Sequence, residues 1–489
     1  MYIGGIDVGT SGCKIAVFDK NGTLCEVFYE EYEVTRKGGH HEVNFNIIFE
    51  KVKKVLKSAA LKYKIVSVGV TSFGETFAML DKDDNIIAPS MLYTDVRGED
   101  ECKYLENALS AEKIALKTGV MPHSMYSLPK VMWIKNNMPE AYAKADKVLL
   151  GEDYVVYMLT GNRQIDYSLA ARTLAFNIRE LSYDDEVLSA AGVDKALFST
   201  PVQAGTVAGT LRAGIREEFG IDYDITVVNG CHDQIAAMTG SGVFSDNTAM
   251  DGIGTVECMT FITDNVPDDA EFYKGGYSVV PHINGKYACY ALSFAGGATL
   301  KWFRDNIVPF EHAQCKAEGT DIYATLDAKV KDDPTGILIL PHFAGAATPY
   351  MDSFATATVT GLTFEHDRYD IYKALMEGTS FEMLLNLDYF GDKIKIPQNI
   401  RASGGGSMSD VWLQIKADIL NIPVIALDCS QIGAAGTAML AGKAMGVYTF
   451  DVLKTMAPTR KVFTPNIDKH NVYSQMYKKY SRIYDALKG

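Results

Sequence analysis

The sequence lacks the patterns that mark disulfide-rich, zinc-binding and membrane-spanning proteins. Its eight cysteines are scattered singly with no C-x-x-C pair, which fits neither a disulfide framework nor a zinc site. No stretch approaches the length of a membrane span, and the N-terminus runs into a strand-like segment without the charged and apolar regions of a signal peptide. We therefore expect reduced thiols, a cytoplasmic location and no membrane contact.

Clusters of basic residues and of histidines are also missing. Lys and Arg number 47 against 61 Asp and Glu, which gives a net charge of −14, and no basic block stands out. This balance argues against a nucleic-acid or anionic-membrane partner. Apart from His40 and His41 in a polar segment, the nine histidines are dispersed, so a histidine metal cluster is not indicated.

The composition that remains is typical of a globular protein. The chain has 489 residues, of which 47% are hydrophobic and 22% charged. This is enough for two or three domains with sizeable cores.

The most informative features are two acidic, glycine-flanked turns. The first is the run Asp-Val-Gly-Thr-Ser-Gly-Cys-Lys at residues 7–14, and the second is Asp-Gly-Ile-Gly-Thr at residues 251–255. Such turns let backbone N–H groups approach phosphate oxygens while the acid faces a metal or a metal-bound water. Either turn alone is more simply explained as a tight hairpin. Two of them, one in each half, indicate a nucleotide held between related domains.

The surroundings of the first turn favour the second explanation. Residues 3–7 read as a buried strand and residues 14–19 as the returning strand, with a further turn at Asn21 and Gly22. This strand–turn–strand hairpin differs from the strand–turn–helix of a Walker P-loop, whose motif G-x-x-x-x-G-K-[ST] is absent from the sequence. The topology resembles that of the actin, Hsp70 and sugar kinase superfamily.

The pattern restarts in the second half of the chain. A hinge is predicted at residues 241–247, and strands at 247–251 and 257–262 then flank the second turn. This weak internal repeat predicts an α/β fold with an N-terminal domain at residues 1–242 and a C-terminal domain at residues 243–489.

Several longer motifs resemble the FGGY family of carbohydrate kinases, and the match runs nearly end to end. Residues 125–137, from Met125 to Asn137, fit the family's first signature at each constrained position. Further similar segments are Thr160-Gly161-Asn162 with Asp166-Tyr167-Ser168, residues 340–349, and an approximate second signature at residues 357–362 and 374–377.

The resemblance implies two actin-like (ribonuclease H-like) domains that flank a cleft for ATP, Mg²⁺ and a sugar. Phosphoryl transfer needs alignment, charge neutralisation and an acceptor for the hydroxyl proton. Asp233 occupies the frame of the family's catalytic Asp, after a strand at residues 226–229 and before a helix. Without the resemblance, a helix N-cap would be the commoner role for this aspartate.

The resemblance also assigns the nucleotide side of the cleft. Asp7 would orient a metal-bound water, Gly9, Thr10 and Ser11 would cradle the transferred phosphate, and Lys14 would offset its charge, although a surface-facing strand lysine fits Lys14 equally well. The second half would contribute further positions along the nucleotide, which are Gly254, Thr255, Gly296, Gly297, Gly404, Gly405 and Ser409.

The sugar site includes a departure from the glycerol kinase pattern. Gly74 stands where glycerol kinases place an arginine, while Glu75 remains, and Asp95 lies in a segment like that of ketose kinases. Two carboxylates offer several acceptors for sugar hydroxyls and would repel an aldonate. The remaining sugar-site candidates are Tyr126, His232 and Gln234.

The function indicated is ATP-dependent phosphorylation of a small neutral sugar, such as a pentulose or a longer polyol. Gluconate and glycerol are the alternative substrates. Other classes also remain open, namely a non-catalytic ATP-binding scaffold of the actin or Hsp70 kind and a phosphohydrolase of the same superfamily. A homodimer is neither indicated nor excluded.

Overall fold

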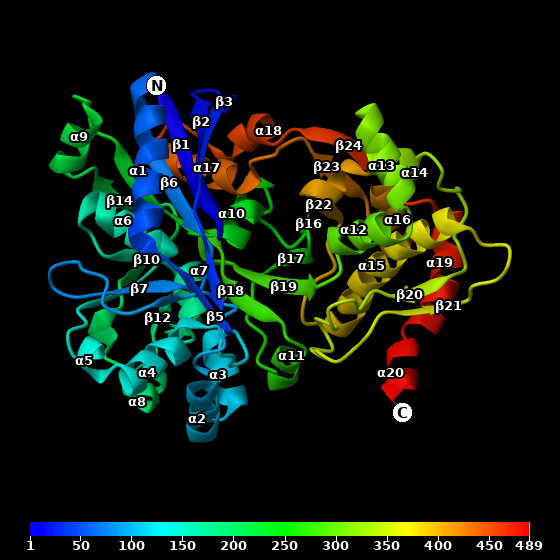
Figure 1. Ribbon diagram of the computed structural model, residues 1–489, viewed down its shortest axis with the longest axis horizontal. Helices are drawn as coiled ribbons and strands as arrows, with labels where there is room; N and C mark the ends of the chain where they lie inside the picture. Colours follow the sequence, from blue (N-terminus) through cyan, green and yellow to red (C-terminus); the bar gives the residue numbers. More distant parts are fainter. Residues whose placement is uncertain (489) are drawn as a thin grey trace.

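A six-stranded sheet forms the centre of the N-terminal half (Figure 1). The computed structural model describes residues 1–488. The strand order is β14-β15-β6-β1-β2-β3, with β1, β6 and β15 parallel to one another. The bounds are β1 Tyr2–Val8, β2 Gly12–Asp19, β3 Leu24–Glu31, β6 Ile65–Ser72, β14 Val207–Thr210 and β15 Thr226–His232.

Helices cover both faces of this sheet. On one face α1 (Phe45–Lys62) turns its apolar stripe inward, with Phe45, Ile48 and Val52 buried at helical spacing. On the other face lies α17 (Ile432–Ala444), which comes from the C-terminal half. A Cβ at Gly5 would lie 1.9 Å from the Ala434 carbonyl oxygen, so the missing side chain lets α17 rest directly on the sheet.

A seven-stranded sheet with the strand order β18-β19-β17-β16-β22-β23-β24 forms the centre of the C-terminal half. Read from β24, its first six strands follow the same order as the strands of the N-terminal sheet read from β14. In both halves an antiparallel hairpin pairs with two successive parallel strands, so the predicted repeat is confirmed. The bounds are β16 Thr248–Ile253, β17 Glu257–Thr263, β18 Ser278–Pro281, β19 Tyr287–Ser293, β22 Asn399–Ser403, β23 Val424–Leu427 and β24 Thr459–Phe463.

The helices that matter most for the site follow these strands. They are α4 Ser127–Asn137, α6 Gly151–Thr160, α7 Tyr167–Ala170, η1 Ala171–Thr173, α10 Asp233–Gly240, α12 Gly297–Asn306, α15 Arg368–Phe390 and α16 Asp410–Leu420. The other elements are β4 Thr35–Lys37, β5 His40–Val43, β7 Phe77–Leu80, β8 Ser90–Met91, α2 Glu99–Leu109, α3 Ala111–Thr118, α5 Pro139–Tyr142, β9 Lys147–Leu150, β10 Gln164–Asp166, β11 Phe176–Asn177, β12 Ser182–Tyr183, α8 Asp185–Ala191, η2 Lys195–Leu197, β13 Thr200–Val202, α9 Ala213–Phe219, α11 Ala270–Lys274, η3 Ile283–Gly285, α13 Pro309–Glu318, α14 Ile322–Asp327, β20 Leu338–Leu340, β21 Thr358–Thr360, η4 Gly405–Met408, η5 Phe450–Val452, α18 Leu453–Met456, α19 Ile467–Tyr480 and α20 Ile483–Lys488.

Besides the contact of α17 with the N-terminal sheet, two further junctions connect the halves closely. Helices α10 and α17 pack backbone to backbone, because a Cβ at Gly436 would lie 2.0 Å from the Ala236 carbonyl oxygen. Farther along, the edge strand β18 joins the N-terminal half through a hydrogen bond from Val279 N to Gly119 O (2.7 Å). Within residues 1–488 no helix is long and apolar enough to cross a bilayer.

Candidate active site

Three parallel strands place the predicted catalytic residues at one edge of the N-terminal sheet. β1, β6 and β15 end at Val8, Ser72 and His232, and parallel strands that end together bring the segments after them together. These segments carry the first glycine turn, the Gly74-Glu75 pair and Asp233. The predicted grouping of the three segments is therefore built into the sheet.

Hydrogen bonds hold the first turn in a tight shape. Gly9 N donates to Gly12 O (2.9 Å), and the Tyr32 hydroxyl donates to the carbonyls of both glycines. Thr10 is half-buried and Ser11 is exposed. Because the carbonyls already have a partner, the open side of this turn can present backbone N–H groups to an anion.

Lys14 and Asp7 face each other across the hairpin, with Nζ 3.1 Å from Oδ2. The structure thus pairs the two groups that were assigned to phosphate charge and to metal-bound water. The Asp7 side chain is only 19% exposed, and it is close enough to Asp233 to raise the pKa of that carboxyl.

Asp233 has the protonation behaviour of a general base. Burial, and after it the carboxylates of Asp7 and Glu75, raise its pKa to about 7. The side chain is still 40% exposed, so it can be reached from solvent. A carboxylate that titrates near neutral pH is well matched to accept a hydroxyl proton.

His232 lies beside this aspartate, with Nε2 3.2 Å from Asp233 Oδ1. Burial and the guanidinium of Arg172 hold the pKa of His232 well below its usual range, so the ring is neutral. Its backbone N donates to Ser168 Oγ (3.0 Å), which ties the end of β15 to α7.

Arg172 is the main residue that the sequence reading missed. From η1 it donates Nε to Glu75 Oε1 (2.6 Å), and its guanidinium lies over the Tyr126 ring at 5.0 Å. A Cβ at Gly74 would lie 3.0 Å from His232 Nε2 and 3.2 Å from Arg172 Cγ. The space beside position 74 is thus filled by the stem of an arginine from another segment. The available signal was a charged residue in a run, residues 169–176, in which only Thr173 is otherwise polar.

Glu75 is held in an unusual backbone conformation. Its φ of 63° is left-handed, which costs a non-glycine residue about 1–2 kcal/mol. Ser127 Oγ donates to its carbonyl oxygen (2.6 Å), and Arg172 holds its carboxylate. Backbone strain that neighbouring groups maintain in this way is typical of functional sites.

Asp95 is placed differently from the expectation of a free acceptor. Its oxygens accept from Arg97 Nε (2.8 Å), Arg97 Nη2 (2.6 Å) and His41 N (2.7 Å), and its side chain is fully buried. Lys130 of the first signature donates to the backbone oxygens of Asp95 (3.0 Å) and Arg97 (3.3 Å), and so fixes this loop. The argument that two free carboxylates repel an aldonate is thereby weakened, because Glu75 and Asp95 each have an arginine partner.

The acid of the second turn does not face a metal site, contrary to the expectation. Asp251 is fully buried, with Oδ2 3.0 Å from the Nζ of Lys416 on α16. The same ammonium contacts Glu257, which follows the turn. Burial and the neighbouring Asp251 raise the pKa of Glu257 to about 8. Asp251, Lys416 and Glu257 form a buried triad, in which the Lys416 ammonium connects the residue at the start of the turn to the residue that follows it.

Glycines bring three loops of the C-terminal half together around this turn. Gly297 N donates to Gly254 O (2.8 Å), and Ala298 N donates to Thr255 O (3.0 Å), so the start of α12 rests on the turn. A Cβ at Gly296 would lie 2.7 Å from the Val256 carbonyl carbon, and one at Gly404 2.6 Å from Ile253 O.

Two further positions on this side differ in how open they are. A Cβ at Gly405 would meet nothing within 4 Å among the described residues, so the backbone there is accessible. The Ser409 hydroxyl donates to Asp327 Oδ2 (2.7 Å) and caps α16, accepting from Trp412 N (3.1 Å).

The last sugar-site candidate, Gln234, lies next to Asp233 and is half-buried.

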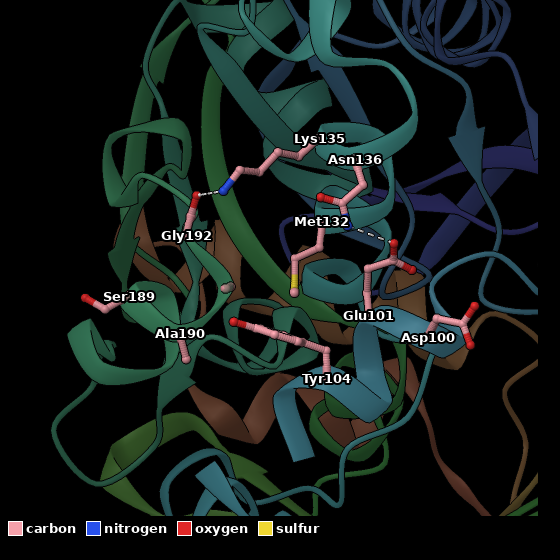
Figure 2. Close-up of a pocket in the computed structure, with 10 residues that line it drawn as sticks. Asp100, Glu101, Tyr104, Met132, Lys135, Asn136, Ser189, Ala190 and Gly192 are labelled. Atoms are coloured by element: carbon pink, nitrogen blue, oxygen red, sulfur yellow. Dashed lines mark hydrogen bonds between the residues drawn. The ribbon is translucent and has the colours of Figure 1, made fainter. Parts of the chain in front are cut away.

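A separate hollow of about 460 Å³ lies between α2, α4 and the end of α8. Figure 2 shows two hydrogen bonds among its lining residues: Lys135 donates to the Gly192 carbonyl and Asn136 to Glu101. None of its lining residues belongs to the predicted site.

The two-domain α/β architecture, with the predicted site residues at one edge of the N-terminal sheet, defines an actin-like sugar kinase fold. The chain belongs to the FGGY family of carbohydrate kinases: the family's N-terminal domain matches residues 2–240 and its C-terminal domain residues 252–445. The chain is therefore a phosphotransferase with a sugar hydroxyl as acceptor, as the sequence predicted. This favours the kinase over the scaffold and the phosphohydrolase.

Relatives with different substrates are similar to the chain to nearly the same degree. A xylulose kinase of Staphylococcus epidermidis (strain RP62A) is 27% identical, over 99% of this chain and 96% of the relative. A glycerol kinase of Thermococcus gammatolerans is 28% identical, over 96% and 94%. The crystal structure of a gluconate kinase from Lactobacillus acidophilus has a TM-score of 0.89 at 24% identity, covering 99% and 98%, and confirms the fold.

Proposed function

We propose that the chain phosphorylates a neutral ketose, most simply a pentulose, with ATP and Mg²⁺, and that Asp233 is the general base. The observation that carries this proposal is Asp233 itself, whose pKa of about 7 and partial exposure suit proton transfer at neutral pH. Xylulose kinases among the relatives support the substrate class.

The charges around Asp233 favour a neutral substrate. Glu75 and Arg172 form an ion pair, Asp7 and Lys14 form another, and His232 is neutral. No described side chain thus offers an unpaired positive charge next to Asp233 for an aldonate carboxylate. Sugar hydroxyls can bind such a site through hydrogen bonds without a charge to balance.

Each half has a distinct task in the proposed reaction. Residues 1–242 would supply the base and most of the sugar site, and residues 243–489 most of the nucleotide site. ATP, when bound with Mg²⁺, supplies the phosphoryl group. Gly9, Thr10, Ser11 and Lys14, with Gly254, Thr255, Gly296, Gly297, Gly404, Gly405 and Ser409, would hold the nucleotide, and Asp7 would hold the hydrated metal.

The residues of the sugar site then orient the acceptor hydroxyl. Glu75, Gly74, Tyr126 and Gln234 would surround the sugar, with Asp95 acting on it through Arg97. Asp233 would accept the hydroxyl proton as the oxygen is phosphorylated, while Asp7 keeps a negative charge close by and so supports the basicity of Asp233. A cytoplasmic location stays a prediction, and whether the chain forms a homodimer stays open.

The test is a panel of ketoses, alditols and aldonates in a coupled assay of ADP release. The proposal expects release that depends on sugar and is fastest with a ketose. Equal or faster release with glycerol or gluconate would contradict the substrate class. Release without any sugar at the same rate would contradict kinase activity.

A further inference from the structure

Two buried hydrogen-bond donors at the sugar site have no partner anywhere in residues 1–488. They are the Tyr290 hydroxyl and the Arg172 Nη1 group. The exposed fraction is only 5% for Tyr290 and 7% for Arg172. Buried polar groups are nearly always hydrogen-bonded in folded proteins, so an orphaned pair calls for an explanation such as a missing ligand.

Both residues lie close to His232. Arg172 Cγ and His232 Nε2 are both within 3.2 Å of the Cβ position of Gly74, and the rings of His232 and Tyr290 have centroids 6.4 Å apart. His232 Nε2 is in turn 3.2 Å from Asp233 Oδ1, a buried atom that itself has no hydrogen-bond partner within the described chain. Two donors, one acceptor and the Nδ1 atom of His232 thus lack partners around the proposed base within residues 1–488.

The two donors come from different halves of the molecule. Arg172 belongs to η1, while Tyr290 belongs to β19 of the C-terminal sheet. Strands β18 and β19 extend from that sheet towards α7 (Figure 1), and Val279 N bonds Gly119 O across the junction. The sugar site is therefore completed by the C-terminal half.

We propose that Arg172 and Tyr290 are specificity-determining residues that together donate to one oxygen of the substrate. A carbonyl oxygen suits them best, because it accepts two hydrogen bonds and has no proton of its own to place. A hydroxyl at the same point must also find an acceptor for its proton between two donors. The pair therefore selects a ketose over the alditol made by reducing it. This inference rests on the proposed function.

Tyr290→Phe is the leading test, because it removes only the hydroxyl. That hydroxyl has no hydrogen-bond partner within residues 1–488, so the variant should keep or slightly raise the melting temperature. With the best ketose of the panel, kcat/KM should fall by roughly 2- to 12-fold, the effect of one lost neutral hydrogen bond. The kcat/KM for the matching alditol should change less, so the ketose-to-alditol ratio falls, and the KM for ATP should stay the same.

Tyr183→Phe is the matched control. Its hydroxyl is also buried and unpartnered among residues 1–488, but its charged neighbours are Asp153 and Arg163 rather than Asp233 and Arg172. This variant should leave the ratio unchanged. Arg172→Lys gives a second reading: it keeps a cation for Glu75, removes the forked donor and should lower the ratio as well.

The outcomes separate this inference from the proposed function. If sugar-dependent ADP release persists and Tyr290→Phe leaves the ketose-to-alditol ratio unchanged, the inference is wrong while the kinase assignment stands. If no sugar of the panel stimulates ADP release by the wild-type protein, the proposed function fails. A ratio that falls equally in Tyr183→Phe would also overturn the inference.

Discussion

Replacing Lys416 by methionine should weaken ATP use without affecting sugar binding. Lys416 is 1% exposed at its side chain and is the counter-ion of Asp251 and Glu257, which precede and follow the second glycine turn. Removing the ammonium leaves two carboxyl groups buried without a cation. Breaking a buried ion pair in this way costs about 3–5 kcal/mol of folding stability.

The effect on the reaction follows from the position of the turn. Gly254 and Thr255 lie in the turn between Asp251 and Glu257, the two acids of the buried triad. If the ends of this turn are no longer held in place, its backbone N–H groups are poorly oriented for binding phosphate. Losing one charged hydrogen bond of this kind costs about 1.5–3 kcal/mol, or roughly 10- to 150-fold in kcat/KM for ATP. The KM for the sugar should change little. Steady-state kinetics with each substrate varied in turn, normalised to the folded fraction, measures both.

Lys373→Met is the control for stability alone. Lys373 is equally buried, but on α15 it donates to the carbonyls of Lys331, Asp332 and Asp333. It should lower the melting temperature and leave the KM for ATP unchanged.

Neutralising the whole triad gives a second control. Asp251→Asn, Glu257→Gln and Lys416→Met combined should recover most of the stability, because no buried charge is left alone. If folded Lys416→Met binds and uses ATP like the wild type, the link between triad and turn is refuted.

Three more outcomes are expected. Glu75→Ala should lower kcat/KM for the best sugar by roughly 10- to 150-fold with little change in the KM for ATP, and should also lower the melting temperature because Arg172 loses its partner; unchanged sugar kinetics would contradict the role of Glu75. The kcat/KM should rise with pH through a pKa near 7, since Asp233 must be ionised to act; a flat profile between pH 5.5 and pH 8 would count against it. Sugar and nucleotide together should compact the protein in small-angle scattering by closure about residues 241–247; identical profiles with and without both ligands would exclude closure.

The sheets and the glycine turns could be predicted from the sequence because their signals are local. The run at residues 3–7 and the turn after it became β1 and its hairpin, and the predicted strand at 257–262 became β17. Between residues 99 and 118 the chain forms two helices, α2 and α3. Ser110 adopts a φ of 65° between them and caps the second one, a choice that tertiary packing makes.

Residues that depend on distant partners were beyond sequence reasoning. Glu75 and Arg172 are 97 positions apart in the sequence, and no pattern of hydrophobic or charged residues predicts that they pair. The motif around Asp251 is similar to the motif around Asp7. Only the packing of α16 shows that Asp251 forms a buried ion pair with Lys416 instead.

The central claim, that Asp233 is the base of a sugar kinase, is tested most directly by Asp233→Asn. Turnover with the best sugar should fall by roughly 10²- to 10⁴-fold, the range for a lost general base. Folding and ATP binding, followed by melting temperature and calorimetric titration, should stay nearly intact. A folded Asn variant that keeps more than about a tenth of wild-type turnover would contradict the claim.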